Sequence, residues 1–428
     1  MNFNKIKLYI YKIKRNSLTR DTLWVTLARV IRIFIQAAYF IIIARALGVQ
    51  QYGAFVGVTS LISILAPFAG WGSDHILVRN VSRERNLFAE SWGNALIITL
   101  VSSLIFLVFI LFNFSALLPP TIPFLVVFFV TISDLVFDIV LRLTSRAFQA
   151  VQNLKITAQL NILPSLTRLM AALCLITFFS KPKTTVWAGL YMIGTIVAAL
   201  IGLFCVRYFL GKPKLSFKNI KQEIIPGFYF AASMSSIGIY NHIDKTMLAR
   251  FSTLEATGIY AAAYRLIEVS FVPIASLVFA SYPNFFKHGE RGICNSVHFA
   301  LKLLPVSVIY SLLIALAVYA FAPIIPYVLG EEYYTAIEAL RWLALLPFIQ
   351  CLHALGGNTL TGADLQGIVT SMRVGIAVFN IVANLWLIPL YSWKGAVWST
   401  LASDGLLALS CWLIITWYYC KDRKGEVS

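Results

Sequence analysis

The chain has 428 residues, of which 59% are hydrophobic and 12% charged, and its formal net charge is +17 at pH 7. Ordinary soluble domains carry about a quarter of their residues as Asp, Glu, Lys or Arg, so this composition excludes a soluble protein and indicates a polytopic membrane protein. Most Lys and Arg residues lie in the links between hydrophobic runs, where they retain those links on the cytoplasmic side. Topology therefore accounts for the charge, and we expect no nucleic-acid partner.

Hydrophobic runs near the ~20 residues that cross a bilayer recur along the whole chain, with short links between them. The sequence therefore predicts an all-α, polytopic membrane protein with twelve transmembrane helices and no separate soluble domain. The predicted spans are 22–46, 51–72, 89–112, 121–143, 158–179, 185–209, 226–248, 256–282, 296–320, 334–356, 369–390 and 394–419.

The first predicted span follows a basic segment and is too long for the apolar part of a signal peptide, so we expect it to stay in the mature protein. Lys and Arg gather at both ends of the chain and in the even-numbered links, which predicts that the N- and C-termini are cytoplasmic. The opposite side carries few basic residues: Arg45, Lys181, Lys183, Arg250 and Lys394.

Cysteine spacing argues against a metal centre. The six cysteines are scattered, without a CxxC pair and without a histidine at zinc-site spacing: Cys174, Cys205, Cys294, Cys351, Cys411 and Cys420. The sequence thus predicts neither a disulfide framework nor a metal site. It also has no nucleotide or nucleophile motif, so we expect a transporter rather than an enzyme, with no cofactor beyond a coupling H⁺ or Na⁺.

A short motif occurs twice. "IARALGVQQYGAF" (43–55) joins the first two spans, and "LARFSTLEATGIY" (248–260) joins the seventh and eighth. In each copy a glycine follows the arginine by eight residues: Arg45 with Gly53, and Arg250 with Gly258. The repeat predicts that the two halves of the chain are built alike.

A weaker echo links "FQAVQNLKITA" (148–158), before the fifth span, to "LTGADLQGIVT" (360–370), before the eleventh. Each copy of the repeat would hold six spans, an even number, so both halves would have the same orientation and be related by an axis along the membrane normal. We therefore predict two pseudo-symmetric lobes, 1–210 and 211–428, around a central cavity.

The first span carries a polar stripe at helical spacing: Thr22, Thr26, Arg29, Arg32, Gln36 and Tyr39. A charged side chain at membrane depth costs a few kcal/mol and usually faces a partner or a water-filled cavity. We expect the stripe to line the lobe interior or the cavity. Snorkelling to the cytoplasmic interface is the alternative for Arg29, and it is harder for the deeper Arg32.

The fourth and fifth spans carry further charges. Asp134 and Asp138 lie one turn apart in the fourth span, and Ser165 and Arg168 share a face of the fifth. These residues are candidate partners for the first-span arginines. The alternatives are a structural charge network within the N-terminal lobe, contact of Arg168 with cargo, and binding of a coupling ion by the aspartates.

In the second half, Arg265 lies near the middle of the eighth span, with Glu268 at a spacing that allows the two to pair. Arg265 is the best candidate in this half for holding an anion. Tyr264 and Glu268 are included as cavity candidates, and Asp244 and Asp404, in the seventh and twelfth spans, as ion-coupling candidates.

Arginines from both halves would suit a negatively charged head group, because the guanidinium fork stays charged and matches phosphate oxygens bidentately. Sugars would need polar and aromatic walls. Candidates around the seventh and eighth spans are Tyr229, Tyr240, Asn241, Tyr260 and Tyr264.

The stretch "IYNHIDKTMLARFSTLEATGIYAAAYRLIE" (239–268) resembles the polysaccharide-transporter branch of the MOP superfamily, the O-antigen (Wzx-type) flippases. "ARALGVQQYGAF" (44–55) and "RAFQAVQNLKITA" (146–158) add to the likeness, which extends over the twelve-helix layout. By helix and depth, Arg29, Arg32 and Arg265 lie where such families place cavity cations.

The resemblance implies export of undecaprenyl-pyrophosphate-linked oligosaccharide repeat units (O-antigen, capsule or exopolysaccharide) across the bacterial inner membrane by alternating access, driven by an ion gradient. The implied partners are the lipid-linked oligosaccharide, membrane lipids, a polysaccharide polymerase and a chain-length regulator. Two alternatives stay open. A MATE-like drug or cation antiporter would favour an acidic cavity, and a membrane glycan polymerase or ligase would need a large external loop.

Overall fold

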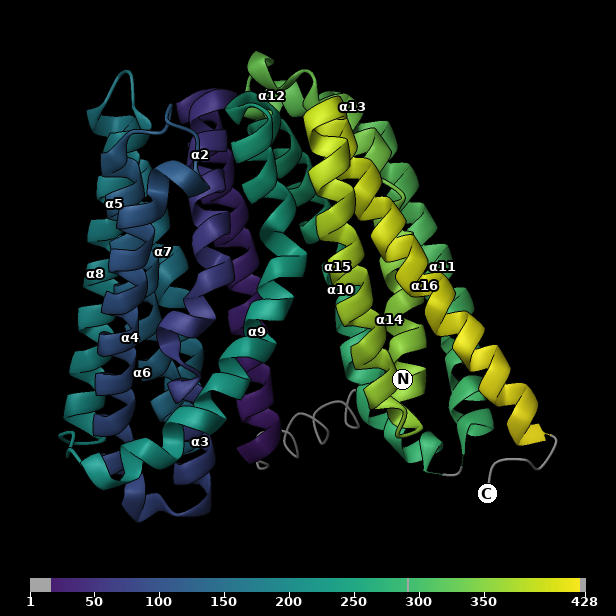
Figure 1. The fold of residues 1–428 in the computed structure, drawn as a ribbon, viewed down its shortest axis with the longest axis horizontal. Helices are drawn as coiled ribbons and strands as arrows, with labels where there is room; N and C mark the ends of the chain where they lie inside the picture. The colour runs from purple at the N-terminus through teal and green to yellow at the C-terminus, as the bar shows by residue number, and fades with distance from the viewer. Residues whose placement is uncertain (1–16, 291, 424–428) are drawn as a thin grey trace, which may run out of the picture. The chain divides into compact units, whose positions relative to one another are not determined.

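The computed structural model describes residues 17–290 and 292–423, and all the elements in these ranges are helical (Figure 1). Within these ranges, ten helices are long and apolar enough to cross a membrane. The first of these lies in α2 (Ser17–Gly70), which breaks at Gly48 and so supplies two spans. The more polar α9 (Phe217–Phe251) supplies one more, and the prediction of twelve transmembrane helices is confirmed.

The remaining elements follow in chain order. They are α3 (Ser73–Arg83), η1 (Arg85–Leu87), α4 (Phe88–Leu117), α5 (Phe124–Ile132), η2 (Ser133–Phe137), α6 (Asp138–Ala150), α7 (Leu154–Phe178), α8 (Thr184–Phe209), α10 (Leu254–Gly289), α11 (Ile293–Phe321), η3 (Ala322–Ile324), α12 (Ile325–Leu329), η4 (Glu331–Tyr333), α13 (Ala336–Leu343), α14 (Leu346–Gly362), α15 (Gln366–Tyr391) and α16 (Trp393–Arg423). The predicted fourth span is α5, η2 and α6 together, and the predicted tenth span is α13 and α14.

The chain packs into two compact units. Unit 1 contains the described residues up to Leu47 and Val58–Gly238, and unit 2 contains Gly48–Gly57 and the described residues from Ile239 onward. In unit 1, α4 to α8 lie side by side; in unit 2, α10, α14, α15 and α16 do so (Figure 1). The packing units therefore differ from the two halves of the sequence repeat, because 48–57 packs with unit 2 and the first part of α9 packs with unit 1.

The break in α2 is a glycine with a left-handed backbone. Gly48 has φ of +74°, a conformation that costs residues with a Cβ atom. The next residue, Val49, begins the second span, and its N–H donates to Glu332 Oε2 at 3.0 Å. A Cβ atom at position 48 would overlap that carboxylate. Glu332 of η4 thus caps a helix N-terminus that glycine itself cannot cap.

The corresponding helix start in the second half is capped differently. Thr253 precedes α10, and its hydroxyl accepts a hydrogen bond of 3.0 Å from the N–H of Ala256. In both copies of the repeat the helix start is therefore capped. The cap is the neighbouring Thr253 in one copy and the distant Glu332 in the other.

Replacing Glu332 by Ala is expected to lower the stability of the purified protein by about 1 kcal/mol, because it removes the cap of the second span. Thermal unfolding in detergent would show this as a lower Tm. Glu331→Ala, which removes a neighbouring exposed carboxylate, is the control and should leave the Tm unchanged. Equal Tm values for the two variants would contradict the capping role.

The two copies of the motif pack against each other in unit 2. A Cβ atom built on Gly53 would overlap the carbonyl oxygen of Leu254, and one built on Gly258 would overlap that of Val49. Each glycine thus meets the residue four positions before the other glycine. This reciprocal contact is what a local two-fold axis produces, and it explains why both copies carry glycine at this position.

The weaker echo has the same backbone in both places. Gln152 (φ +64°) and Asp364 (φ +62°) are both left-handed. Asn153 N–H donates to Phe148 O at 2.9 Å, and Leu365 N–H donates to Leu360 O at 3.0 Å. Both hydrogen bonds close the six-residue loop typical of a helix C-terminus. The structure therefore supports the repeat at this second position as well.

The first part of α9 is held on unit 1. Trp71 Nε1 donates to Ile224 O at 3.0 Å, and Asn80 Nδ2 donates to Glu223 Oε1 at 2.9 Å. A Cβ atom at Gly227 would overlap the carbonyl oxygen of Trp71, so the two backbones approach closely. These contacts explain why α9 belongs to unit 1 up to Gly238.

Candidate functional site

Unit 1 contains a charge cluster between the predicted fourth, fifth and sixth spans. Arg168 Nη2 of α7 lies 3.1 Å from Asp138 Oδ1 and 3.7 Å from Asp134 Oδ1. Arg142 Nε lies 3.3 Å from Asp138 Oδ2. Tyr191 of α8 donates its hydroxyl to Asp134 at 2.7 Å, and its ring lies 4.7 Å from the Arg168 guanidinium. Two carboxylates and two guanidinium groups balance their charges inside one unit.

The helix that carries the two aspartates is widened at this point. Asp134 lies in the π-helical segment η2, and Asp138 begins α6 directly after it. Single π-helical turns inside an α-helix are frequent at functional sites because they re-aim side chains. Both carboxylates lie within ion-pair distance of Arg168 at this point.

Asp134 and Asp138 both form ion pairs with Arg168, and Asp138 also pairs with Arg142. Pairing of these aspartates with the first-span arginines stays a prediction. Arg168 keeps 17% of its side chain exposed and is bound by two carboxylates. The geometry thus favours the alternative of a structural network over cargo contact for Arg168.

The stripe of the first span meets α7 through a hydrogen bond. Gln36 Nε2 donates to Ser165 Oγ at 3.4 Å, so the outer part of the stripe faces the interior of unit 1. Arg29 and Arg32, further toward the start of the helix, have exposed side chains. The same helix therefore packs against unit 1 with one part and presents two guanidinium groups at its surface with the other.

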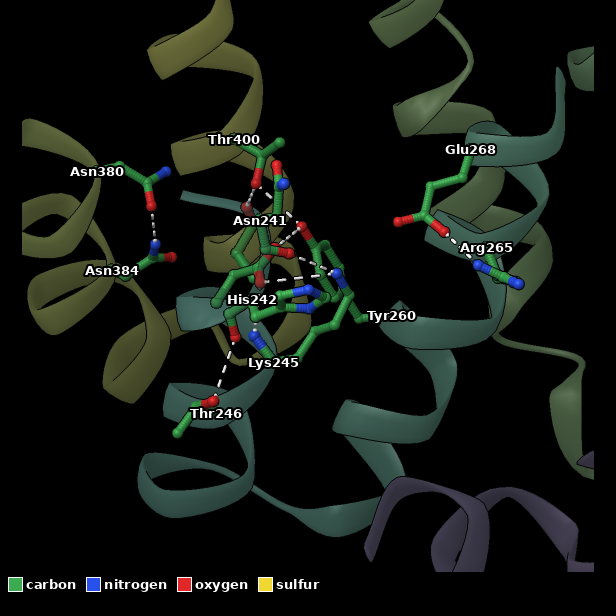
Figure 2. Close-up of polar contacts among 12 residues, drawn as sticks. Asn241, His242, Lys245, Thr246, Tyr260, Arg265, Glu268, Asn380, Asn384 and Thr400 are labelled. Carbon is green, nitrogen blue, oxygen red and sulfur yellow. Dashed lines mark hydrogen bonds and ion pairs between the residues drawn. The ribbon is translucent and has the colours of Figure 1, made fainter. Parts of the chain in front are cut away.

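In unit 2 a second polar cluster surrounds Asp244 of α9. Its neighbours Lys245, Tyr260 and Thr400 are labelled in Figure 2. Tyr260 of α10 donates its hydroxyl to Asp244 Oδ2 and shares a hydrogen bond of 2.9 Å with Thr400 of α16. Lys245 Nζ donates to Asn241 O at 2.9 Å, lies 3.9 Å from Asp244 Oδ1 and sits 4.0 Å from the Tyr264 ring centroid. Asp244 and Lys245 thus have mainly separate partners, as expected for neighbours in a helix.

Arg265 and Glu268 pair with each other, apart from the cluster around Lys245 and Tyr260 (Figure 2). Arg265 Nη1 lies 2.9 Å from Glu268 Oε2, and the two side chains are 30% and 39% exposed. The predicted pairing is confirmed. The carboxylate offsets the positive charge of Arg265, so an anion bound there would have to share the guanidinium with Glu268 or displace it.

Asp404 lies in α16 with only 2% of its side chain exposed. Tyr240 of α9 donates its hydroxyl to Asp404 Oδ1, and His353 Nε2 of α14 lies 3.7 Å from the same oxygen. Sequence analysis identified Asp404 and Tyr240 but did not single out His353. A lone histidine in an apolar helix gives no pattern from which its partner can be found.

A chain of amide and hydroxyl groups joins α15 to α16. Asn384 Nδ2 donates to Asn380 Oδ1 at 3.0 Å, and Asn380 Nδ2 donates to Ser403 Oγ at 3.0 Å. Ser399 donates to Asn384 Oδ1 (the two asparagines are labelled in Figure 2). Sequence analysis missed these residues, although asparagines four apart in one apolar helix and serines four apart in the next are the signal that would have found them.

Two basic residues of unit 2 have exposed partners. Lys394 Nζ lies 2.8 Å from Glu338 Oε1, and the Arg341 guanidinium lies 5.0 Å from the ring centroid of Tyr319. Among the residues that the structure describes, no group of three His, Cys, Asp or Glu side chains could hold a metal ion.

Comparisons with known proteins agree with this architecture. The family model described as "Polysaccharide biosynthesis protein" matches residues 18–288. A curated relative from Haloferax volcanii, "Probable low-salt glycan biosynthesis flippase Agl15", is 24% identical over 400 residues, covering 90% of this chain and 81% of the relative.

Solved structures show the fold. An inward-facing multidrug resistance MATE family transporter of the MOP superfamily superposes with a TM-score of 0.75 at 14% identity, covering 91% of this chain and 96% of that one. The lipid II flippase MurJ in an inward closed conformation gives a TM-score of 0.71 at 10% identity, with coverages of 92% and 87%. The chain thus has a MATE/MurJ-like fold, and it belongs to the polysaccharide biosynthesis protein family.

Proposed function

We propose that this protein is a flippase that moves lipid-linked glycans across the membrane. The observation that carries the proposal is the exposure of Arg29 and Arg32 on a membrane-spanning helix of a polysaccharide biosynthesis family member. Guanidinium groups at membrane depth suit a phosphate or pyrophosphate, which must be held while it crosses an apolar layer. The likeness to a relative named as a glycan flippase supports the same reading.

We further propose a specific cargo and an ion gradient as the energy source. The cargo is an undecaprenyl-pyrophosphate-linked oligosaccharide repeat unit of an O-antigen, capsule or exopolysaccharide. Arg29 and Arg32 hold its phosphates, and Arg265, shared with Glu268, is the candidate anion-binding residue of unit 2. An ion gradient drives alternating access, and the buried carboxylates Asp134, Asp138, Asp244 and Asp404 are the candidate carriers of H⁺ or Na⁺.

Translocation in proteoliposomes tests this proposal. Liposomes would hold the purified protein and a lipid-linked oligosaccharide with a radiolabelled sugar, and a membrane-impermeant glycosidase would report the amount in the outer leaflet. We expect time-dependent transfer with the protein and none in protein-free liposomes. No transfer in either case, with or without imposed proton or sodium gradients, would contradict the proposal.

The second candidate is a MATE-like exporter of cationic drugs, favoured by the fold alone. The same proteoliposomes, loaded with a cationic dye, decide between the two functions. We expect no dye export, because exposed arginines repel a cation. Export of the dye without transfer of the glycan would favour the exporter.

The proposed orientation, with both termini in the cytoplasm of a bacterial inner membrane, can be checked through Cys420. This cysteine lies in the exposed last part of α16. In a variant with the other five cysteines replaced by alanine, we expect an impermeant maleimide to label Cys420 in inverted vesicles and not in intact cells. Introducing a cysteine at Lys181 of the Cys420→Ala chain gives the matched control, which should show the opposite pattern. Labelling of Cys420 in intact cells would reverse the orientation.

A further inference from the structure

The carboxylates placed well inside the membrane-spanning helices have different partners. Asp134 and Asp138 bind Arg168, and Glu268 binds Arg265. Asp244 lies 3.9 Å from Lys245 and accepts the Tyr260 hydroxyl.

For these four carboxylates the basic partner is Arg or Lys, which keeps its charge at any physiological pH. For Asp404 the basic group within 4 Å is His353, whose charge depends on bound protons. Asp404 therefore differs from these four carboxylates in having no permanent counter-charge at ion-pair distance.

The burial of this site makes its charge state important. The side chains of Asp404 and His353 are 2% and 19% exposed. A lone carboxylate in such surroundings is costly, because neither water nor a cation compensates it. One bound proton makes the pair neutral overall, whereas without it the pair has one uncompensated negative charge.

The groups that face the pair favour a proton on Asp404. Arg373 of α15 acts on His353 electrostatically, and a positively charged imidazole beside this guanidinium would be unfavourable. Arg373 Nη2 also lies 3.6 Å from the position of a Cβ atom built on Gly357, one turn beyond His353 on α14. The proton is therefore best placed on the carboxyl group, beside a neutral imidazole.

Other ionisable groups lie on the helices that supply this site and on α10. Tyr240 of α9 donates its hydroxyl to Asp404, and Cys411 lies two turns further along α16. On α10, Tyr264 packs on Lys245, and Arg265 and Glu268 bind each other.

We propose that Asp404, with His353 and Tyr240, forms a proton-binding site in unit 2, and that the proton is the coupling ion of transport. This inference rests on the proposed flippase function. The three residues come from α16, α14 and α9, so a rearrangement of these helices that admits water would stabilise the carboxylate and release the proton. Loading and unloading of one proton would thus favour different packings of the same three helices.

The first test detects the proton directly in the purified full-length protein. Infrared difference spectroscopy in detergent, as pH is raised, should show loss of a C=O stretching band of a protonated carboxyl group. The band should be absent in Asp404→Asn. Asp364→Asn is the matched control: Asp364 is exposed, and its left-handed backbone (φ +62°) is one that Asn also tolerates. A wild-type spectrum without such a band, or a band unchanged in Asp404→Asn, would overturn the proposal whether or not the protein moves glycans.

The second test measures coupling in proteoliposomes with a trapped pH-sensitive dye. Wild type and Asp364→Asn should move protons when a lipid-linked oligosaccharide gradient is imposed, and a pH gradient should drive glycan accumulation. Asp404→Asn should reduce proton movement and pH-driven glycan accumulation to the level of protein-free liposomes. It should still let the glycan equilibrate down its own gradient. His353→Gln should change the pH dependence of the accumulation rate.

Wild-type coupling in Asp404→Asn, or accumulation driven by Na⁺ and not by pH, would overturn the coupling role. If the wild-type protein does not let the glycan equilibrate down its own gradient, this would instead contradict the proposed function.

Discussion

Replacing Arg29 and Arg32 together by alanine is expected to abolish glycan export while leaving the amount of protein and its membrane insertion normal. Both side chains are exposed on a membrane-spanning helix, where a phosphate can reach them. A hydrogen bond to a charged group contributes about 1.5–3 kcal/mol, so each lost guanidinium–phosphate contact should reduce export roughly tenfold or more. Surface glycan in a flippase-deletion strain carrying each variant measures the effect, with immunoblots for the protein level.

Two further variants test whether the charge or the fork geometry matters. Arg32→Lys should restore export only in part, because lysine is a point charge without the bidentate fork. Arg45→Ala, an exposed arginine at the predicted outer end of the same span, should export normally. Normal export by the double alanine variant would show that these arginines do not bind cargo.

Replacing Gly258 by valine is expected to lower the stability of the folded protein strongly. The valine Cβ would overlap the carbonyl oxygen of Val49, and backbone cannot move aside as the end of a flexible side chain can. Overpacking of this kind costs on the order of 3 kcal/mol, a large part of the stability of a folded protein. Gly53→Val should have a similar effect through the carbonyl of Leu254, because the contact is reciprocal.

The measurement is the Tm of each variant after purification in detergent, together with its elution in gel filtration. Gly375→Ala is the control, since a Cβ atom at this position of α15 meets nothing within 4 Å, and its Tm should equal or exceed that of the wild type. A Gly258→Val protein with the wild-type Tm would contradict the close approach of the two motifs.

Sequence alone predicted the helical layout well. The reason is physical: a bilayer demands runs of about 20 apolar residues, and the links between them are short and polar. Even α9, whose polar residues keep it out of the set of clearly apolar helices, was placed correctly between 226 and 248 because the spacing of its neighbours required a span there. The repeated Arg-to-Gly motif was visible for a similar reason, since close backbone approach requires glycine.

The partners of the buried charges were harder to predict. Helical spacing shows which residues share a face, so the Arg265–Glu268 pair could be predicted. It does not show which helices are neighbours, so the pairing of Asp134 with Arg168 was not singled out. The π turn at Ser133–Phe137, next to the two aspartates, has no signal in the sequence pattern either.

The division into packing units was also invisible in the sequence. Residues 48–57 are continuous with the first span along the chain, but they pack with unit 2 through the contact of Gly53 with Leu254. Only tertiary contacts reveal such an exchange, because each segment reads as an ordinary part of its own helix. Sequence patterns likewise do not show which polar residues contact cargo, so the cavity candidates stay predictions.

The most direct test of the central claim is the affinity of the purified protein for a short-chain polyprenyl pyrophosphate, measured in detergent at fixed ionic strength. We predict that the double variant Arg29→Ala/Arg32→Ala binds this head group at least about tenfold more weakly than the wild type, as expected for lost charge-assisted contacts. The Arg45→Ala variant should bind like the wild type. Equal affinity of the wild type and the double variant would contradict the claim that these two arginines hold the phosphates of the lipid carrier.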